Sequence, residues 1–468
     1  MTSIAASPRP YDAIIIGSGQ AGNPLAAALS AAGKRTALIE RAAVGGTCVN
    51  YGCTPTKAMV ASAEVAYLAR RAKDYGVTID HVGVDMSAVR DRKRGIVNIW
   101  RTGSEKRIAN SRNVDLLRGE ASFTGPRQLH VRLNDGGELS VTSEIIVIDT
   151  GLSANPPPIP GLASVPFLDN VSIMELDTVP DHLLVLGGGY IGLEFAQMFR
   201  RFGSRVTIIH NAPQLLPNED ADIATEIAKI LREDGIEIFL EAETQSASGT
   251  SGEIELSVGI AGHSRKVTGS HLLVATGRKP NTDALNLHAA GVATTPHGFI
   301  TVDDKLRTNV PGIYAVGDVN GGPAFTHIAY DDFRILKANL LESGNCSTTS
   351  RLIPYCVFID PQLGRIGLSE KQAAAQGRKV RIARLPMTSV ARAMETSQTQ
   401  GFMKALVDPE THQILGAAIL GEDGGEIMSM IQIAMMGKLK YTTLQAAVFA
   451  HPAYAESLNN LFSNIKDN

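Results

Sequence analysis

Hydrophobic residues along this chain gather in short continuous runs, and longer amphipathic stretches separate these runs. The first run, residues 11–16, leads into a glycine-rich turn at residues 17–22 and then into an Ala- and Leu-rich stretch that reaches Ala32. A second apolar run follows at residues 36–39. Short apolar runs bounded by turn signals predict buried strands, and their alternation with helices predicts an α/β fold built on parallel sheets.

The same order of elements returns later in the chain. An apolar run at residues 183–186 leads into a second glycine-rich turn, a helix through Arg201 and a further run at residues 206–209. Strand, G-x-G-x-x-G turn and helix form the dinucleotide-binding fingerprint, because glycines let the backbone approach a pyrophosphate at a helix N-terminus. Two Rossmann-like folds predict two bound dinucleotides. One constant offset relates their glycines, which pair as Gly17 with Gly187, Gly19 with Gly189, Gly22 with Gly192, and Gly33 with Gly203.

The residue after the second strand of each fold predicts which nucleotide binds there. Glu40 holds this position in the first fold and is placed to accept hydrogen bonds from an adenosine ribose. The constant offset that relates the glycines of the two folds makes His210 the equivalent of Glu40 in the second fold. An imidazole does not repel a 2′-phosphate and can hydrogen-bond one, which favours NADPH over NADH, although no arginine follows nearby to clamp the phosphate.

The segments around these folds predict further elements. Residues 58–112 read as helical and charged, and residues 119–141 alternate like a small antiparallel sheet. A strand at residues 145–148 precedes the proline-rich residues 155–161, which cannot continue a helix or a central strand and predict a crossover between domains. Another apolar strand ends at Asp318, whose carboxylate could receive a polyol hydroxyl of a flavin.

Beyond residue 351 the pattern changes to short strands followed by an apolar helix. The strands are expected at residues 355–358, 402–407 and 414–419. The helix is rich in methionine, and we interpret these thioethers as core filler rather than metal ligands: Met428, Met430, Met435 and Met436.

Size and composition limit the class of protein. A chain of 468 residues is too long for one core and is expected to form several domains. Its net charge of −3 argues against nucleic acid as a partner, because phosphate binding needs a basic face. Residues 1–10 lack the apolar centre of a signal peptide, and the chain has no bilayer-length apolar run, so we expect no membrane contact and a cytoplasmic location.

Two cysteines, Cys48 and Cys53, carry the clearest chemical signal. Thr54 is a plausible N-cap and Pro55 a good first helical residue, so Cys53 is expected at the positive end of a helix dipole, which favours the reactive thiolate. Lys57 adds a second positive charge one turn further along the helix. We interpret the pair as redox-active, since a persistent cysteine pair in the cytosol is more often catalytic than structural.

Two alternatives to a redox pair stay open at this point. A zinc half-site would need a second pair of ligands, but Cys346 and Cys356 stand alone and far away in the sequence. Two unrelated core cysteines are the other alternative.

These motifs resemble one family, the class I pyridine nucleotide–disulfide oxidoreductases. The resemblance covers roughly residues 10–465 and is strongest to the mercuric-reductase-like branch, which includes flavoenzymes that reduce copper or hypothiocyanous acid. It implies an FAD-binding domain at residues 1–150 and 278–345, an NAD(P)H-binding domain at residues 151–277, and a C-terminal dimerisation domain at residues 346–468.

The resemblance also implies residue roles. Cys53 matches the charge-transfer thiol beside the flavin, Cys48 the interchange thiol, and Tyr190 the gate over the nicotinamide pocket. Lys57 and Glu194 match an ion pair near the flavin, and His451 and Glu456 match an acid–base dyad that serves the partner subunit of a homodimer. The residues implied for FAD are Gly17, Gly19, Gln20, Ala21, Gly22, Glu40, Gly46, Thr47, Lys57, Ala121, Thr150, Gly151, Asp318 and His327. Those implied for NADPH are Gly187, Gly189, Tyr190, Ile191, Gly192, Glu194, His210 and Gly277.

The implied function is a reductase for cell redox homeostasis, passing electrons from NADPH through FAD and the Cys48–Cys53 pair to a small disulfide or another thiol-reactive oxidant. A soft-metal reductase acting on Hg or Cu is one alternative, although the C-terminus lacks the vicinal cysteines of mercuric reductase and there is no N-terminal metal-binding cysteine domain. Dihydrolipoamide dehydrogenase is another, disfavoured by His210 where that enzyme has an NAD-selecting acid. A non-catalytic flavin-binding structural or sensor subunit is the third, and the intact cysteine pair and dyad argue against it.

Overall fold

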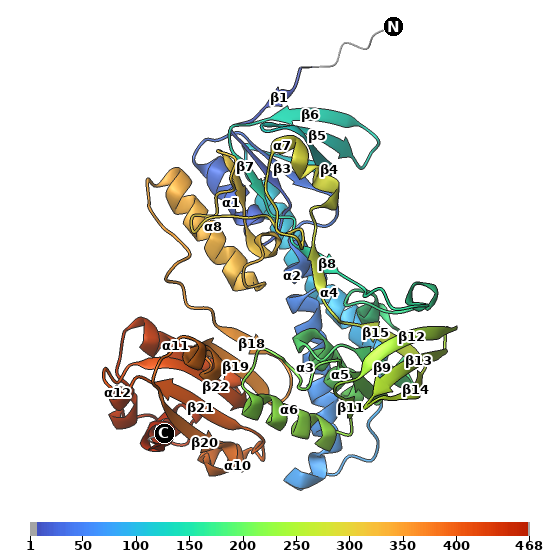
Figure 1. Cartoon of the computed structure of the whole chain (residues 1–468), viewed down its shortest axis with the longest axis vertical. Coiled ribbons are helices and arrows are strands. Elements are labelled where there is room, and N and C mark those ends of the chain that lie inside the picture. Colours follow the sequence, from blue (N-terminus) through green and yellow to red (C-terminus); the bar gives the residue numbers. More distant parts are fainter. Residues whose placement is uncertain (1–6, 467–468) are drawn as a thin grey trace. The chain divides into compact units, whose positions relative to one another are not determined.

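A computed structural model describes residues 7–466, and these form two compact units (Figure 1). The first unit comprises the described parts of residues 1–59, 88–155 and 277–351, and the second those of residues 60–87, 156–276 and 352–468. The finer division into three domains remains a prediction.

The first unit is built on an eight-stranded sheet with the order β1-β6-β5-β4-β3-β2-β7-β17. Its central strands β2 (Ala13–Ile16), β3 (Thr36–Glu40), β7 (Ile146–Ile148) and β17 (Ile313–Ala315) are parallel neighbours. The first three of these strands are buried along their whole length, which explains their continuous apolar sequence. The strands predicted there are thus confirmed.

One edge of this sheet carries the antiparallel excursion that the alternating pattern predicted. β4 (Val114–Gly125) pairs parallel with β3 and then antiparallel with β5 (Gln128–Leu133). β6 (Glu138–Thr142) follows, and β1 (Arg9–Pro10) closes the edge. A short antiparallel pair, β8 (Leu152–Ala154) with β16 (Arg278–Pro280), lies outside the large sheet.

Helices α1 (Gly22–Ala31) and α8 (Thr326–Leu341) contact each other, and their apolar residues form one core cluster with Ile15 and Val147 of the sheet. The remaining helices with residues in this unit are α2 (Gly46–Asn50), α3 (Cys53–Arg70), α4 (Met86–Ala109) and α7 (Leu287–Ala290). α3 and α4 each extend from one unit into the other.

The continuous helical reading of residues 58–112 was wrong in its middle. α3 ends at Arg70, and only a short 3₁₀ turn, Ala72–Tyr75, follows before a non-helical segment that runs to Asp85. Gly76 ends that turn with φ of 74°, a left-handed conformation that suits glycine and stops a helix.

The second unit contains the repeated fold. Its four-stranded parallel sheet has the order β11-β10-β9-β15, formed by β9 (His182–Leu186), β10 (Arg205–Ile209), β11 (Glu237–Phe239) and β15 (His271–Val274). α5 (Tyr190–Phe202) connects β9 to β10, and α6 (Ala221–Glu233) precedes β11. A three-stranded antiparallel sheet follows, made of β12 (Glu243–Thr250), β13 (Glu253–Ile260) and β14 (His263–Gly269).

The C-terminal part of this unit is a six-stranded antiparallel sheet with the order β18-β19-β22-β21-β20-β23. Its strands are β18 (Tyr355–Val357), β19 (Gln362–Gly367), β20 (Arg381–Pro386), β21 (Phe402–Val407), β22 (Ile414–Gly421) and β23 (Ile465–Lys466). The helices are α9 (Glu370–Ala375), α10 (Ala391–Glu395), α11 (Gly424–Met436), α12 (Tyr441–Ala446) and α13 (Ser457–Ser463).

The methionine-rich helix is α11, and only part of it fills the core. Met428 is buried against β19 and β22, whereas Met436 is 67% exposed. The prediction that all four methionines are core filler was therefore wrong for Met430 and Met436, which face outward together with Ile433.

Candidate redox and dinucleotide-binding sites

The two cysteines of the first unit lie together at the junction of two helices. Cys48 belongs to α2, and Cys53 is the first residue of α3. Both are thiols rather than halves of a disulfide, with Cys48 partly buried and Cys53 exposed. A hydrogen bond to Cys53 and burial raise the pKa of Cys48. Cys48 therefore keeps its proton and supports negative charge on the sulfur of Cys53.

α3 begins two residues earlier than the sequence predicted. The Gly52 carbonyl accepts the first helical hydrogen bond, from the Thr56 amide at 3.0 Å, and also accepts from the Thr56 hydroxyl at 2.7 Å. Gly52 thus takes the N-cap position, and the prediction that Thr54 caps the helix was wrong. Cys53 still lies in the first turn of α3, where the amides are not used within the helix, so the positive end of the helix dipole favours its thiolate.

Two further groups act on the thiol pair. The Thr326 hydroxyl, at the first residue of α8, lies 3.3 Å from the Cys53 sulfur. Thr326 and the Lys57 ammonium both counteract the rise in the pKa of Cys48, so both stabilise negative charge at the pair. Sequence reasoning missed Thr326, because α8 begins 273 positions after Cys53 and only the fold brings them together.

The first glycine-rich turn has the close backbone packing that a pyrophosphate site requires. Gly17 has φ of 100°, and a Cβ there would lie 2.2 Å from the Asp149 carbonyl oxygen. A Cβ on Gly46 would lie 2.7 Å from the Gly19 Cα, so the start of α2 packs directly on the turn. The Gln20 amide also donates to the Gly45 carbonyl at 3.0 Å. Ala21 is the buried N-cap of α1, and Thr47 lies in α2 beside Cys48.

Glu40 is held at the end of β3 by hydrogen bonds from the turn. Its carboxylate accepts from the Ser18 amide at 3.0 Å, from the Ser18 hydroxyl at 2.7 Å and from the Ala42 amide at 2.8 Å. These bonds fix the orientation of the carboxylate at the carboxyl end of a parallel strand, where the ribose of a dinucleotide binds in this type of fold.

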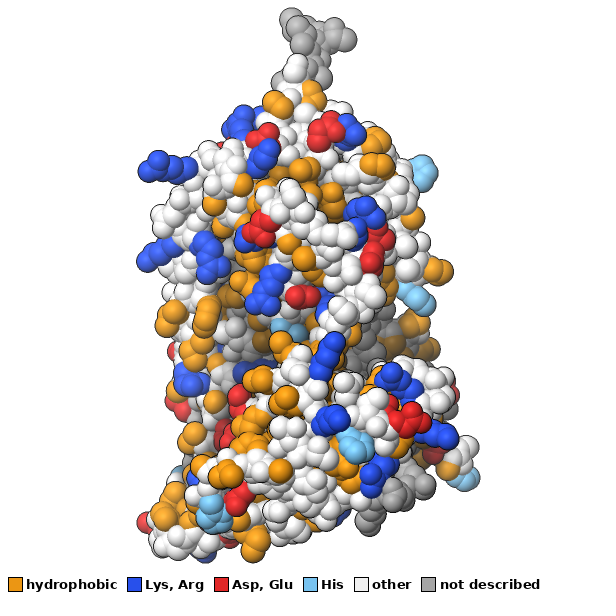
Figure 2. Space-filling model, turned by 90° about the vertical axis from the view of Figure 1, so that its left-hand side faces the viewer, with side chains coloured by type: hydrophobic (Ala, Val, Ile, Leu, Met, Phe, Trp, Pro, Cys, Tyr) orange, Lys and Arg blue, Asp and Glu red, His pale blue; other side chains and the backbone are white. Residues whose placement is uncertain are grey.

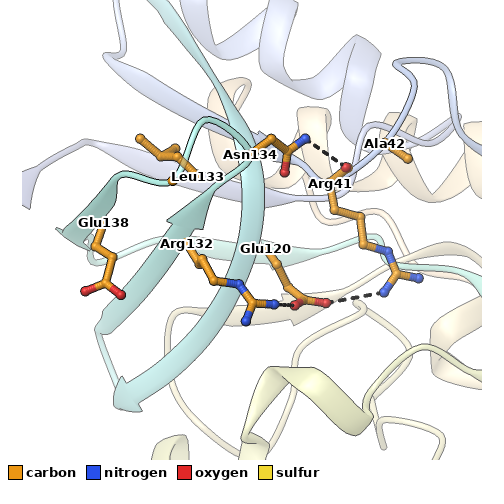
Figure 3. A pocket seen from close by; sticks show the side chains of 8 residues that line it. Arg41, Ala42, Glu120, Arg132, Leu133, Asn134 and Glu138 are labelled. Atoms are coloured by element: carbon orange, nitrogen blue, oxygen red, sulfur yellow. Dashed lines mark hydrogen bonds and ion pairs between the residues drawn. The ribbon is translucent and has the colours of Figure 1, made fainter.

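An open pocket of about 560 Å³ begins directly after Glu40 (Figure 3). The carboxylate of Glu120 lies between two guanidinium groups in it, 2.6 Å from that of Arg132 and 3.6 Å from that of Arg41. Asn134, between β5 and β6, donates to the Arg41 carbonyl at 3.1 Å and so connects this hairpin to the end of β3. Ala121, next to Glu120, is buried and pairs with Val131 of β5.

The other residues implied for FAD lie in the same unit. The Thr150 hydroxyl is buried and has no hydrogen-bond partner among the described residues, and Gly151 has φ of 65°. The carboxylate of Asp318 lies 3.4 Å from the Arg278 guanidinium. Burial raises the pKa of Asp318, and Arg278 opposes that rise. The ring of His327 stacks on Phe325.

The second glycine-rich turn is packed as closely against backbone as the first, but His210 takes the place that Glu40 has in the first fold. Gly187 has φ of 118°, and a Cβ there would lie 2.5 Å from the Ala275 carbonyl oxygen. Gly189 is the N-cap of α5, whose first turn holds Tyr190, Ile191 and Gly192. The Gly188 amide donates to Nδ1 of His210 at 3.2 Å, so Nε2 carries the hydrogen of the neutral ring.

Nε2 of His210 is a buried atom, and the backbone of Gln214 lies close enough to favour the protonated ring. Burial lowers the pKa of His210, which keeps the imidazole neutral near pH 7. Gly277 lies in the first unit, where its carbonyl accepts from the Asn155 amide at 3.0 Å.

Of the two residue pairs that the resemblance implies, the structure brings together His451 and Glu456, whereas the pairing of Lys57 with Glu194 is not tested. Glu194 is buried in α5 and accepts from the Phe358 amide at 2.9 Å, but it lies in the second unit and Lys57 in the first, so their pairing remains a prediction. His451 and Glu456 do come together, with 2.8 Å between Nδ1 and the carboxylate. The carboxylate fixes the ring and leaves Nε2 available for proton exchange.

One acidic cluster of the second unit is already neutralised. The carboxylates of Asp220, Asp222 and Glu370 lie close enough to hold a cation, but the buried Lys404 ammonium lies among them at 3.0, 2.7 and 2.6 Å. This arrangement is a structural ion-pair network.

The space-filling view shows charged and apolar side chains interspersed on the face it presents (Figure 2). No described helix has both the length and the hydropathy of a membrane-crossing segment.

Comparison with known proteins identifies relatives over nearly the whole chain. The family description "Pyridine nucleotide-disulphide oxidoreductase" matches residues 11–332, and the dimerisation domain of that family matches residues 353–462. The probable pyridine nucleotide-disulfide oxidoreductase RclA of Escherichia coli (strain K12) is 40% identical over 462 residues, which cover 97% of this chain and 99% of RclA. A mercuric reductase of Bacillus cereus is 34% identical over 448 residues, covering 96% of this chain and 70% of that enzyme.

A solved structure of an RclA protein has the same fold as this chain. The Cu(II) complex of the HOCl-induced flavoprotein disulfide reductase RclA from Escherichia coli superimposes with a TM-score of 0.89 at 39% identity. The superposition covers 98% of this chain and 100% of that one.

Proposed function

Because this chain belongs to the pyridine nucleotide-disulphide oxidoreductase family, we propose that it passes electrons from NADPH through FAD to Cys48 and Cys53, and on to a small disulfide or another thiol-reactive oxidant. The observation that carries this proposal is the hydrogen-bonded thiol pair at the start of α3, with Thr326 and Lys57 beside it. A dithiol in which one sulfur bears charge and the other holds a proton is ready for disulfide exchange.

The first unit fits FAD. The turn of Gly17, Gly19 and Gly22 leads from β2 into the N-terminus of α1, and the Glu40 carboxylate is held at the end of β3, where the ribose of a dinucleotide binds in this type of fold. We assign the pocket between Arg41 and Glu120 to the adenine end, because it follows the ribose-binding acid directly. The Thr150 hydroxyl, which has no hydrogen-bond partner in residues 7–466, provides a donor beside the turn. When bound, FAD accepts hydride from the nicotinamide and delivers the electron pair to a disulfide.

The thiol chemistry follows from the protonation of the pair. His451, held by Glu456, takes the proton of Cys48, and the Cys48 sulfur attacks the oxidised acceptor. A bond forms between Cys48 and the acceptor sulfur, and the leaving group departs with the proton from His451. Cys53 then attacks the Cys48 sulfur, which releases the acceptor reduced by two electrons and leaves a Cys48–Cys53 disulfide.

We assign the second glycine-rich turn to NADPH and the C-terminal sheet to a homodimer. His210 holds the position of Glu40 in the second fold, and its neutral ring, bonded to the Gly188 amide, does not repel a 2′-phosphate. The dimerisation-domain match supports two copies of the chain, with the dyad of one serving the thiols of the other. We place this activity in cytoplasmic redox homeostasis.

The test is NADPH oxidation by purified protein with glutathione disulfide, lipoamide and hypothiocyanous acid, offered separately. Fast turnover of one acceptor, abolished in Cys48→Ser and in Cys53→Ser, supports the proposal. Cys346→Ser is the matched control, because Cys346 is an exposed thiol remote from the pair in sequence, and it should leave turnover unchanged. Turnover that survives in both active-pair variants would refute the assignment.

Cu(II) is a second candidate acceptor, which the Cu(II) complex of E. coli RclA favours. Thiolates bind soft metal ions, so the reduced pair could pass one electron to each of two Cu(II) ions. Cu(I) trapped by a chelator during NADPH oxidation, and lost in Cys48→Ser, would support this reaction. Equal Cu(I) formation in wild type and variant would exclude the pair as its site.

A further inference from the structure

A buried carboxyl group lies directly against the first glycine-rich turn. Asp149 follows β7 and is 7% exposed. Its Oδ2 accepts from the Gly22 amide at 2.7 Å. Gly22 is the first residue of α1, so its amide belongs to the helix end that the fold directs at a pyrophosphate. An acidic side chain therefore takes a donor at the place where an anionic cofactor group is expected.

The carboxyl group also touches the backbone on two sides. A Cβ on Gly19 would lie 2.7 Å from Oδ2, and a Cβ on Gly317 would lie 3.1 Å from Oδ1. Gly317 precedes Asp318, the residue expected at the flavin polyol. Asp149 is thus packed between the two backbone turns that form the cofactor cradle, and the Gly22 amide is its hydrogen-bond donor among the described residues.

The charged groups that face Asp149 are acidic. They are Asp318 in the turn after β17, Asp332 of α8 and Glu40 of β3. The nearby cations already have partners, since Arg351 lies 2.6 Å from Asp332 and Arg278 lies 3.4 Å from Asp318. Burial is the main cause that raises the pKa of Asp149 well above its usual range, and these three acids add to it.

We propose that Asp149 is a positioning residue whose proton is linked to FAD binding: the neutral acid holds the glycine-rich turn, and the ionised form repels the incoming pyrophosphate. The inference rests on the proposed FAD site. Because the pyrophosphate is anionic, FAD binds the protonated form more tightly, and binding above the pKa of the free protein takes up a proton. The dissociation constant is therefore flat at low pH and rises up to tenfold per pH unit above that pKa.

The experiment uses full-length protein freed of flavin and titrated with FAD between pH 6 and pH 9, following flavin fluorescence. Wild type should bind progressively more weakly as the pH rises. Asp149→Asn keeps the shape and an acceptor for the Gly22 amide but cannot ionise, so its profile should be flat. Asp12→Asn is the matched control, since exposed Asp12 also accepts one backbone amide, from Arg35 at 2.8 Å, and should follow wild type.

Calorimetry in two buffers of different ionisation enthalpy gives a second readout on the wild type alone. Proton uptake on FAD binding at pH 8, absent in Asp149→Asn, supports the proposal, and the wild-type value stands even if the variant fails to fold. A pH-independent dissociation constant without proton uptake, or equal pH slopes in wild type and Asp149→Asn, overturns it. Failure of the wild type to bind FAD at all would instead refute the proposed flavin site.

Discussion

Thr326→Val tests how the fold tunes the thiol pair. The variant keeps the shape of the side chain but removes the hydroxyl that lies 3.3 Å from the Cys53 sulfur. A hydrogen bond to a charged group contributes about 1.5–3 kcal/mol, and one pKa unit corresponds to about 1.4 kcal/mol. The S···O contact is long and Cys53 is exposed, so we expect the lower end of this range: a shift of about one pH unit.

The assay is alkylation of the dithiothreitol-reduced protein by iodoacetamide, with the modification of Cys53 followed by mass spectrometry as a function of pH. The midpoint should move upward by about one pH unit in Thr326→Val, because the thiolate loses its donor. Thr326→Ser should restore the wild-type profile. Thr225→Val, which removes a helical hydroxyl in the second unit, is the matched control. An unchanged midpoint in Thr326→Val would refute the tuning role of this hydroxyl.

Three further changes test other parts of the account. His210→Glu should lower kcat/KM for NADPH at least tenfold relative to NADH, because a carboxylate repels the 2′-phosphate; an unchanged ratio in steady-state kinetics would contradict the assignment of His210. Glu456→Gln should slow turnover by about 100-fold at an unchanged rate of flavin reduction in stopped-flow, because the ring of His451 loses its support; full turnover would exclude the dyad. Lys404→Met should cost about 3–5 kcal/mol in urea denaturation, because three carboxylates lose their buried cation, whereas Lys229→Met at an exposed pair should cost less than about 1 kcal/mol; equal losses would contradict the burial argument.

The sequence predicted the local features well. The glycine-rich turns, the strands before them and Glu40 form one continuous signal, because the fingerprint depends on residues close together in the chain. The α/β fold, the family and the oxidoreductase class were confirmed by the family match and the solved relative. Cys48 and Cys53 are also close in the sequence, on α2 and at the start of α3, so their spacing was enough to predict a pair.

Features that depend on distant segments were missed. Thr326 and Asp149 reach the site from α8 and from the end of β7, and no motif near Cys53 or Gly22 reports them. Local rules also failed where two signals competed. Thr54 looks like an N-cap, but Gly52 supplies the first carbonyl of α3. α3 ends at Arg70, and the short turn that follows ends at Gly76, within a charged stretch that otherwise reads as helical.

Single-turnover thiol labelling shows whether Cys48 and Cys53 carry the electrons from NADPH to the acceptor. Enzyme reduced by one equivalent of NADPH should carry two alkylatable thiols, at Cys48 and Cys53, and one equivalent of acceptor should remove both and leave a peptide pair joined by a disulfide. Cys346 and Cys356 serve as internal controls, because their labelling should not change. Equal labelling of Cys48 and Cys53 before and after an acceptor has been reduced would contradict the account.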